Sequence, residues 1–198
     1  MQFKGNMIIL KRVPSELDVF SVEFLTILQK HVDYVVISGY VSILLGRTRA
    51  TDDIDVFIKK IPQETFVKLY QELQDKGFWC LNAESENEIF SYLEEGLAVR
   101  FAKKGKSAPN FEIKFPKDAL DEETFTNFIF VKLSIGEIKI SSLERQIAFK
   151  RYYLRSDKDC EDALHIEELF KEEIDYIKVN KYKELIEQRK EQHDGAKK

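Results

Sequence analysis

The sequence predicts an α/β (α+β) fold, with a short mixed sheet flanked by helices and a helical C-terminal region. Three patterns predict it: a strand, tight turn, short helix and second strand over residues 34–58, strand-like segments over residues 97–140, and helical spacing from Ser142 onward. Of the 198 residues, 43% are hydrophobic and 33% are charged. This composition is typical of a globular protein with a heavily charged surface and room for one core.

The same patterns divide the chain into parts. We expect a core over residues 1–140, a helical region over residues 141–192 and a disordered tail over residues 193–198. No apolar run approaches the roughly 20 residues of a membrane span, and the N-terminus lacks the apolar region of a signal peptide. Cys80 and Cys160 lie far apart without a CxxC motif, so we expect reduced cysteines in a cytoplasmic protein with no membrane partner.

The elements before residue 96 follow from apolar spacing and from boundary residues. Ser15 is a suitable N-cap for the first helix. Pro62 suits the first turn of a later helix, and Gly77 suits its end. In chain order, the predicted elements are a helix over 15–31, a strand over 33–37, a short helix ending near Gly46, a strand carrying Asp53 and Asp55, a helix over 63–76, a strand over 78–81 and a helix over 86–95.

The second half of the chain continues the sheet and then becomes helical. Alternating residues predict strands over 97–102 and 110–115, joined by the segment KKGKSAP. Residues 128–135 and 137–140 form a second predicted hairpin, which turns at Gly136. The sequence therefore predicts that every strand lies before residue 141.

Asp53 and Asp55 form the most informative pair of side chains. Because side chains alternate faces along a strand, both carboxylates project to one side, while Ile54 and Val56 face apolar packing. Two neighbouring carboxylates repel each other unless a cation lies between them, and hard oxygen ligands suit magnesium. The pair therefore indicates a metal site, the alternative being two surface acids at the end of a strand.

The turn at Ser38-Gly39 lies between the first strand and the short helix. A glycine at such a turn lets backbone N–H groups and a helix N-terminus approach an anion closely. A phosphate site beside a pair of metal-binding carboxylates indicates a nucleotide enzyme. Tyr40, directly after the turn, packs either near the base or in the core.

These residues resemble the signature of the DNA polymerase β-like nucleotidyltransferase superfamily. Its small members have Gly-Gly or Gly-Ser, a short helix, a glycine and then Arg-x-Thr-x-Asp-Ile-Asp. The matching residues are Ser38-Gly39, Gly46, Arg49, Thr51, Asp53 and Asp55, with no gap in the spacing and with Ser38 in place of the usual first glycine. The resemblance implies a nucleotidyltransferase fold. It also implies transfer of an NMP from an NTP to an acceptor hydroxyl, with release of pyrophosphate and help from two magnesium ions.

A third carboxylate is expected on a later strand, and Glu112 is the candidate. Phe111, Ile113 and Phe115 would face the core, which leaves Glu112 and Lys114 on the opposite face. The resemblance implies that Glu112 holds the catalytic metal together with Asp53 and Asp55 and accepts the proton of the acceptor, although this position is usually aspartate. The alternatives are a Glu112–Lys114 surface pair and Asp118 as the third acid.

A second stretch of resemblance covers the helical region. Small nucleotidyltransferases carry a lysine, an arginine, Lys-Asp and a further aspartate after the sheet, which match Lys150, Arg155, Lys158-Asp159 and Asp162, with one extra residue before Lys158. Lys150 or Arg155 would neutralise the β- and γ-phosphates, while Asp159 would orient that cation or cap the following helix. The alternative is a solvated basic helix face.

The resemblance thus gives a full set of expected nucleotide-binding residues. They are Ser38, Gly39, Arg49, Thr51, Lys150, Arg155 and Asp159. For Arg49, pairing with a carboxylate or ordering of the loop is the favoured alternative to a contact with substrate.

The acceptor is the least determined part of the prediction. The chain is most similar to small stand-alone members of the superfamily, including those of the abortive-infection toxin type. The basic run from Arg100 to Lys117 flanks Glu112 and favours RNA, while a protein hydroxyl or a small molecule such as an aminoglycoside stays open. Two rival hypotheses are a catalytically inactive nucleotide-binding or regulatory protein, with a partner protein in a toxin–antitoxin or defence system, and a plain interaction domain.

Overall fold

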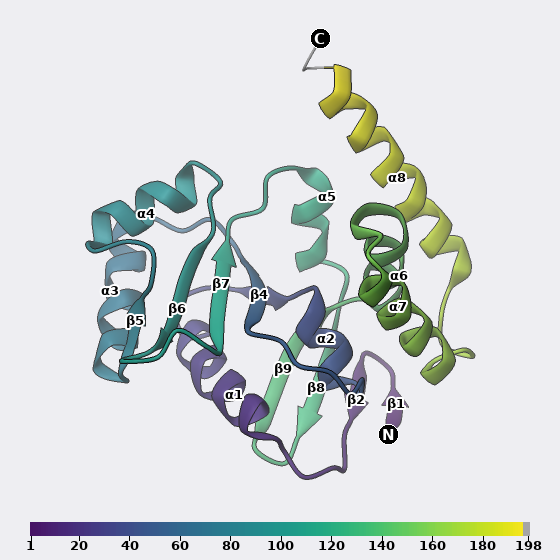
Figure 1. The fold of residues 1–198 in the computed structure, drawn as a ribbon, viewed down its shortest axis with the longest axis horizontal. Coiled ribbons are helices and arrows are strands. Elements are labelled where there is room, and N and C mark those ends of the chain that lie inside the picture. The colour runs from purple at the N-terminus through teal and green to yellow at the C-terminus, as the bar shows by residue number, and fades with distance from the viewer. Residues whose placement is uncertain (196–198) are drawn as a thin grey trace.

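The centre of the molecule is a nine-stranded mixed sheet, and the computed structural model describes residues 1–195 (Figure 1). The strand order is β1-β2-β8-β9-β3-β4-β7-β6-β5. The strands are β1 (Gln2–Lys4), β2 (Met7–Ile9), β3 (Tyr34–Val36), β4 (Asp53–Ile58), β5 (Phe78–Cys80), β6 (Val99–Lys103), β7 (Asn110–Lys114), β8 (Phe128–Leu133) and β9 (Gly136–Ser141). The α/β class expected from the sequence is confirmed.

Helices surround the sheet, and the last three gather on one side of it (Figure 1). The helices are α1 (Glu16–Leu28), α2 (Gly39–Leu44), α3 (Gln63–Asp75), α4 (Glu86–Glu94), α5 (Ala119–Glu122), α6 (Leu143–Ala148), α7 (Asp157–Leu169) and α8 (Tyr176–Gly195). A π-helical turn over Phe149–Leu154 continues α6. Within residues 1–195 no helix has the length and apolar character needed to span a membrane. Residues 196–198 of the expected tail lie outside the described residues.

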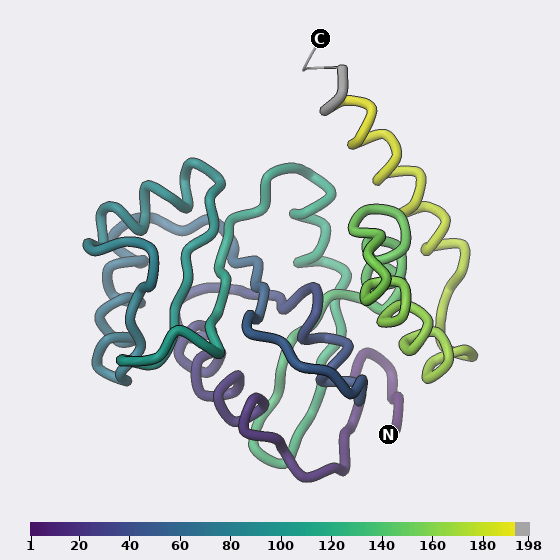
Figure 2. The backbone as a smooth tube through the Cα atoms, viewed as in Figure 1, coloured from purple at the N-terminus to yellow at the C-terminus, as the bar shows by residue number. Residues whose placement is uncertain are grey.

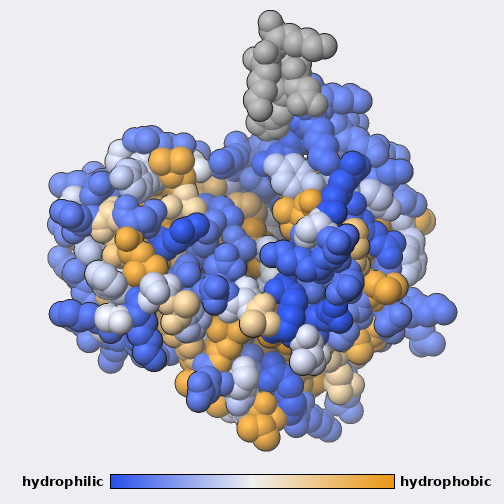
Figure 3. Space-filling view, in the orientation of Figure 1, coloured by the Kyte–Doolittle hydropathy of each residue, from blue (hydrophilic) through white to orange (hydrophobic). Residues whose placement is uncertain are grey.

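One face of the sheet is packed with aromatic side chains. Phe24 of α1 stacks on Phe111 of β7, with ring centroids 4.0 Å apart, and also contacts the ring of Phe78 in β5 at 5.0 Å. Ile54 and Val56 are fully buried in this same core, as their alternation with the aspartates predicts. The polar residues of β4 and β7 therefore point to the opposite face. Outside, hydrophilic residues cover most of the face seen in Figure 3.

Two elements were not expected from the sequence. The hairpin of β1 and β2 adds two strands to one edge of the sheet, where β2 runs parallel to β8. Its Phe3 ring lies 6.0 Å from the ring of Phe170, which directly follows α7, so the N-terminal segment runs beside the C-terminal helices (Figure 2). Strands of three residues are too short to show a period of two. The four-residue α5 is likewise too short to show helical spacing.

A buried ion cluster joins the helical region to the sheet. Asp162 of α7 has no exposed side-chain surface. Its Oδ1 accepts a hydrogen bond from Arg49 Nε at 3.0 Å, and its Oδ2 accepts one from Arg49 Nη2 at 2.7 Å. Lys150 of the π-helical turn is also fully buried, and its Nζ lies 2.9 Å from Asp162 Oδ2 and 3.5 Å from Asp159 Oδ1. The segment that enters β4 is therefore fixed to α7 by an ion pair between the partly buried Arg49 and the fully buried Asp162.

Asp162→Asn should lower the free energy of unfolding by about 3–5 kcal/mol, because it removes the nearer acid of a buried cluster and leaves Lys150 with only Asp159, at 3.5 Å. Urea unfolding followed by circular dichroism measures the loss. Glu161→Gln is the matched control. That carboxylate is 63% exposed and pairs with Arg47, so its loss should cost less than about 1 kcal/mol. Equal losses in the two variants would contradict a special role for the buried cluster.

The difference in the free energy of unfolding between the wild type and Asp162→Asn should also depend on pH. Burial alone would raise the pKa of Asp162, but the hydrogen bonds from Arg49 and Lys150 outweigh burial and hold this pKa below its usual value. A carboxyl group with a lowered folded-state pKa stabilises the protein fully above the unfolded-state pKa of about 4, and this stability is lost as the pH falls through the folded-state pKa. The difference between wild type and Asp162→Asn should therefore be complete at neutral pH and should shrink below about pH 4.

Candidate active site

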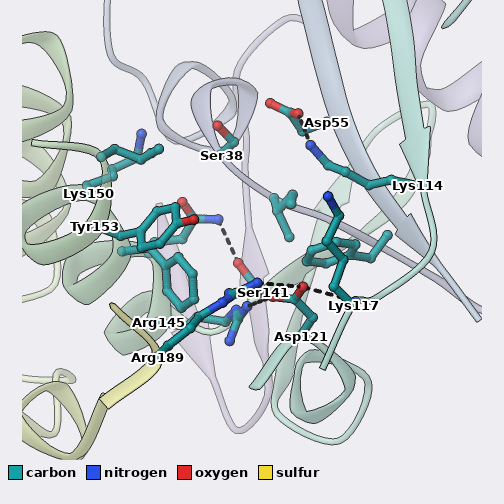
Figure 4. Close-up of a pocket in the computed structure, with 15 residues that line it drawn as sticks. Ser38, Asp55, Lys114, Lys117, Asp121, Ser141, Arg145, Lys150, Tyr153 and Arg189 are labelled. Atoms are coloured by element: carbon teal, nitrogen blue, oxygen red, sulfur yellow. Dashed lines mark hydrogen bonds and ion pairs between the residues drawn. The ribbon is translucent and has the colours of Figure 1, made fainter. Parts of the chain in front are cut away.

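A cleft of about 390 Å³ lies between the sheet and the C-terminal helical region (Figure 4). It is lined by Ile37, Ser38, Asp55, Phe57, Lys114 and Ser141 from the sheet side, by Lys117 and Asp121 from the segment that follows β7, and by Arg145, Gln146, Phe149, Lys150, Tyr153, Leu154 and Arg189 from the helical region. Five of these side chains are cationic and two are anionic. This excess of positive charge suits an anionic ligand such as a nucleotide.

The three expected acids lie on neighbouring strands. β4 and β7 are parallel, and their register places Asp55 directly opposite Glu112. The same register pairs Asp53 with Asn110, at the point where both strands begin. Asp53 is exposed, and its Oδ1 accepts a hydrogen bond of 3.0 Å from the Thr51 hydroxyl. Thr51 therefore orients the first carboxylate of the pair.

Lys114 lies between the two opposed acids. Its Nζ is 2.8 Å from Asp55 Oδ1, a contact drawn in Figure 4, and 3.5 Å from Glu112 Oε1. The Glu112–Lys114 pair considered as an alternative therefore does form, with Lys114 itself lining the cleft. Burial disfavours the charged form of Lys114, yet the carboxylates of Asp55 and Glu112 outweigh it and raise the pKa of the ammonium group. The Asp55–Glu112 pair thus holds a positive charge between its oxygens.

The donor chemistry of these acids fits a hard cation. Asp53 and Asp55 offer carboxylate oxygens on one strand face, which are the ligands magnesium takes from proteins. Among residues 1–195, however, no three His, Cys, Asp or Glu side chains gather as a closed ligand set. One or two carboxylates are enough for magnesium when phosphate oxygens complete its shell.

The turn after β3 has an unusual backbone. Ser38 has φ 63° and ψ −138°, a left-handed conformation that glycine adopts easily and serine does not, which explains the usual glycine of the resembled signature. Gly39 is required for a different reason. A Cβ atom on Gly39 would lie 2.8 Å from Arg49 Nη2, so a larger residue would push this guanidinium group away from the turn.

The other expected nucleotide-binding residues have distinct places. Arg49 pairs with Asp162, as its favoured alternative reading predicts, and its Nη2 also donates to the carbonyl oxygen of Gly39 at 3.3 Å. Lys150 lies in the cleft wall with its ammonium group turned to Asp162 and Asp159. Asp159 also accepts a hydrogen bond from Ser156, the N-cap of α7.

Three further candidates lie elsewhere. Arg155 is exposed after the π-helical turn, adopts φ 63°, and does not line the cleft. Asp118, the substitute for Glu112, caps α5 and pairs with Arg189 at 2.9 Å. Tyr40 is a core residue, and its hydroxyl donates to Asp18 Oδ1 at 3.0 Å.

The cleft also contains residues that the sequence did not indicate. Arg145 of α6 and Arg189 of α8 both pair with Asp121, at 3.4 Å and 3.1 Å. Phe149 and Tyr153 give the same wall an aromatic surface. Arg145, Phe149 and Tyr153 recur at intervals of four residues, a signal that could have marked this helix face. Arg189 belongs to no motif and could not have been found in that way.

The basic run from Arg100 to Lys117 does not form one patch. Arg100 pairs with Glu112 at 3.1 Å, and Lys114 and Lys117 line the cleft. Lys103 instead pairs with Glu23 of α1, on the opposite face of the sheet. Only part of the run therefore surrounds the candidate site.

Comparison with known proteins identifies the fold. No protein-family model matches the chain, and no curated protein matches its sequence. Solved structures do match. A nucleotidyltransferase-like antigenic protein from Paracoccidioides brasiliensis is 15% identical, with a TM-score of 0.50 over 90% of this chain and 89% of its own. The antibiotic-resistance factor ANT(2'')-Ia in solution is 15% identical, with a TM-score of 0.53 over 90% of this chain and 97% of its own.

A crystal structure of ANT(2'')-Ia in complex with adenylyl-2''-tobramycin agrees with this result. It is 13% identical, with a TM-score of 0.52 over 86% of this chain and 97% of its own. At such identity the likeness concerns the fold alone, which this chain shares with these nucleotidyltransferase and nucleotidyltransferase-like structures, as the resemblance of its signature implies.

Ser38→Gly should raise the free energy of unfolding by about 1 kcal/mol. Strain of roughly 1–3 kcal/mol is relieved at a left-handed position, and the greater freedom of glycine in the unfolded chain offsets part of this gain. Ser107→Gly is the matched control, because Ser107 is exposed and does not have a positive φ. It should leave stability unchanged or slightly lower in urea unfolding. The same response from both variants would show that Ser38 is not strained.

Proposed function

We propose that this protein is a magnesium-dependent nucleotidyltransferase, which moves an NMP from an NTP to an acceptor hydroxyl and releases pyrophosphate. The observation that carries the proposal is the register of β4 and β7, which sets Asp55 opposite Glu112 beside the Ser38-Gly39 turn. Both features border a cleft with an excess of cationic side chains. The fold shared with a nucleotidyltransferase-like protein and with ANT(2'')-Ia, whose crystal structure contains adenylyl-2''-tobramycin, supports the same reaction.

In this reaction the acceptor oxygen attacks the α-phosphorus, and the bond to the oxygen that bridges the α- and β-phosphates breaks. Glu112 accepts the proton of the attacking hydroxyl. Asp53 and Asp55 would hold magnesium, which supplies positive charge to the phosphate oxygens when it is bound. Pyrophosphate then leaves with the electron pair of the broken bond.

The nucleotide-binding residues divide into two groups under this proposal. Backbone groups of Ser38 and Gly39 contact the triphosphate directly. Arg49 fixes that turn through its contacts with the Gly39 carbonyl and with Asp162, and Thr51 orients Asp53.

The helical wall supplies the other contacts. Lys150 and Asp159 support it as members of the buried cluster, so a direct contact between Lys150 and a phosphate would require the ammonium group to leave Asp162. Phe149 and Tyr153 offer apolar surface to the base. Arg155 would reach the phosphates only after moving from its exposed position.

We propose RNA as the acceptor. Arg100 and Lys117 lie on the Glu112 side of the cleft and favour a polyanion. Tobramycin, whose adenylyl derivative is bound to ANT(2'')-Ia, is a cationic small molecule, and this surface would repel such an acceptor. A protein hydroxyl, including one on a cognate partner in a toxin–antitoxin or defence system, is the other outcome of the test.

A specific observation favours one rival function. The Lys114 ammonium group already lies between Asp55 and Glu112, as it would in a catalytically inactive nucleotide-binding protein. Such a protein would bind NTP and transfer nothing. Turnover therefore separates the two functions.

Asp55→Asn should abolish magnesium-dependent NTP binding, and Glu112→Gln should keep binding but lose about 10²–10⁴-fold in turnover, because it removes the proton acceptor. Calorimetry with magnesium and each NTP measures binding, and release of pyrophosphate measures turnover. Asp52→Asn is the matched control, since Asp52 is exposed and lies just before β4. Its binding and turnover should equal those of the wild type. Unchanged binding and turnover in Asp55→Asn would refute the site.

RNA incubated with the protein, magnesium and α-labelled NTPs should become labelled, and labelling should fall steeply as salt rises. Lys117→Ala should lower labelling and flatten the salt dependence, because it removes a cation from the acceptor side of the cleft. Lys103→Ala should do neither, because Lys103 lies on the other face of the sheet with Glu23. Label found only on protein or on an added aminoglycoside, or labelling that ignores salt, would overturn the choice of RNA.

A further inference from the structure

Lys114 holds a position that its strand dictates. It lies two residues after Glu112 on β7, so both side chains point to the same face, toward Asp55 on the parallel neighbour. Its Nζ lies 2.8 Å from Asp55 Oδ1 and 3.5 Å from Glu112 Oε1. The side chain is 23% exposed, and the two carboxylates are 18% and 17% exposed. The lysine is therefore a tethered cation within a partly closed site.

Both oxygens of Glu112 already face cations. Oε1 lies near Lys114, and Oε2 accepts hydrogen bonds from Arg100 at 3.1 Å and 3.3 Å. A magnesium ion bound to Asp55 Oδ1 would sit about 2.1 Å from that oxygen, in the space that the ammonium group approaches. Two cations so close together repel each other strongly. Lys114 and a metal ion therefore exclude each other between Asp55 and Glu112.

We infer that Lys114 takes the place of the acceptor-side metal ion, so that the protein works with one magnesium ion, held by Asp53 and by Oδ2 of Asp55 on the nucleotide side. This inference rests on the proposed function. It changes the role of Glu112, which acts as a proton acceptor beside two cationic side chains and not as a metal ligand. Under this inference one metal ion takes part, where the superfamily resemblance implies two.

The test uses Mn²⁺ as the probe, with binding followed by electron paramagnetic resonance in the absence of nucleotide. Lys114→Met should bind Mn²⁺ at least about tenfold more tightly than the wild type, because the competing charge only a few ångströms away is gone. Lys114→Arg keeps the charge and should bind like the wild type. The double variant Lys114→Met, Glu112→Gln should lose the gain, because the new site needs both Asp55 and Glu112.

Lys117→Met is the matched control. Lys117 also lines the cleft, but its backbone N–H donates to Asp121, and within residues 1–195 its ammonium group forms no ion pair with Asp55 or Glu112. Its removal should produce no gain in Mn²⁺ affinity. Equal affinities in wild type and Lys114→Met would overturn the inference, as would a gain that survives Glu112→Gln.

A measurement on the wild type alone keeps the test independent of any variant. With a non-hydrolysable NTP analogue, the protein should bind one Mn²⁺ per nucleotide, and two would overturn the inference. The proposed function fails in a separate way, through calorimetry that detects no magnesium-dependent NTP binding in the wild type. A protein that binds NTP with two metal ions would keep the proposed function and lose only this inference.

Discussion

The geometry of the cleft depends on one buried carboxylate, Asp162. It holds Arg49 from the segment before β4 and Lys150 from the helical region, so one side chain joins the two walls between which a nucleotide would lie. Arg49 in turn reaches the Gly39 carbonyl, which places the turn relative to the strand that carries Asp53 and Asp55. Residues that are neighbours in the resembled signature thus act as one unit, because a charge in the C-terminal region fixes them.

A second ion cluster closes the same cleft from the other end. Asp121 pairs with Arg145 and Arg189, which connects α5 to α6 and α8. Here the desolvation of Arg145 outweighs the attraction of Asp121 and lowers the pKa of its guanidinium group. In both clusters an acid pairs with a base from another region of the chain: Asp162 of α7 pairs with Arg49, and Asp121 of α5 pairs with Arg145 and Arg189. Cationic side chains are thereby kept along the cleft, where the proposed triphosphate would lie.

Alternation along strands explains why much of the site could be predicted from the sequence. A period of two fixes the faces of Asp53, Asp55 and Glu112 as soon as their strands are assigned, and the aromatic residues beside Glu112 are buried as expected. The sequence could not show that β4 and β7 are adjacent and parallel, because pairing is a tertiary property. The superfamily resemblance supplied only the expectation of a third carboxylate on a later strand.

Helical residues were harder to place for a related reason. The sequence pattern of a charged helical residue is the same whether its side chain faces water or a buried partner. Nothing in the sequence therefore distinguishes the buried Lys150 from the exposed Arg155. Lys150 is the buried one because it pairs with Asp162, a residue that the sequence indicated only as part of a motif. Lys114 was visible as a neighbour of Glu112, but its contact with Asp55 needs the second strand.

The position of β2 in the sheet has a consequence for the order in which the chain folds. β2 pairs with β8, more than 120 residues later, and Phe3 packs against Phe170. Contacts so distant in sequence close large loops, which slows folding. During synthesis the first hairpin must wait until most of the chain has left the ribosome. Until β8 is synthesised, the backbone groups of β2 that face it are free to pair with another strand. Correct pairing at this edge therefore depends on the synthesis of β8.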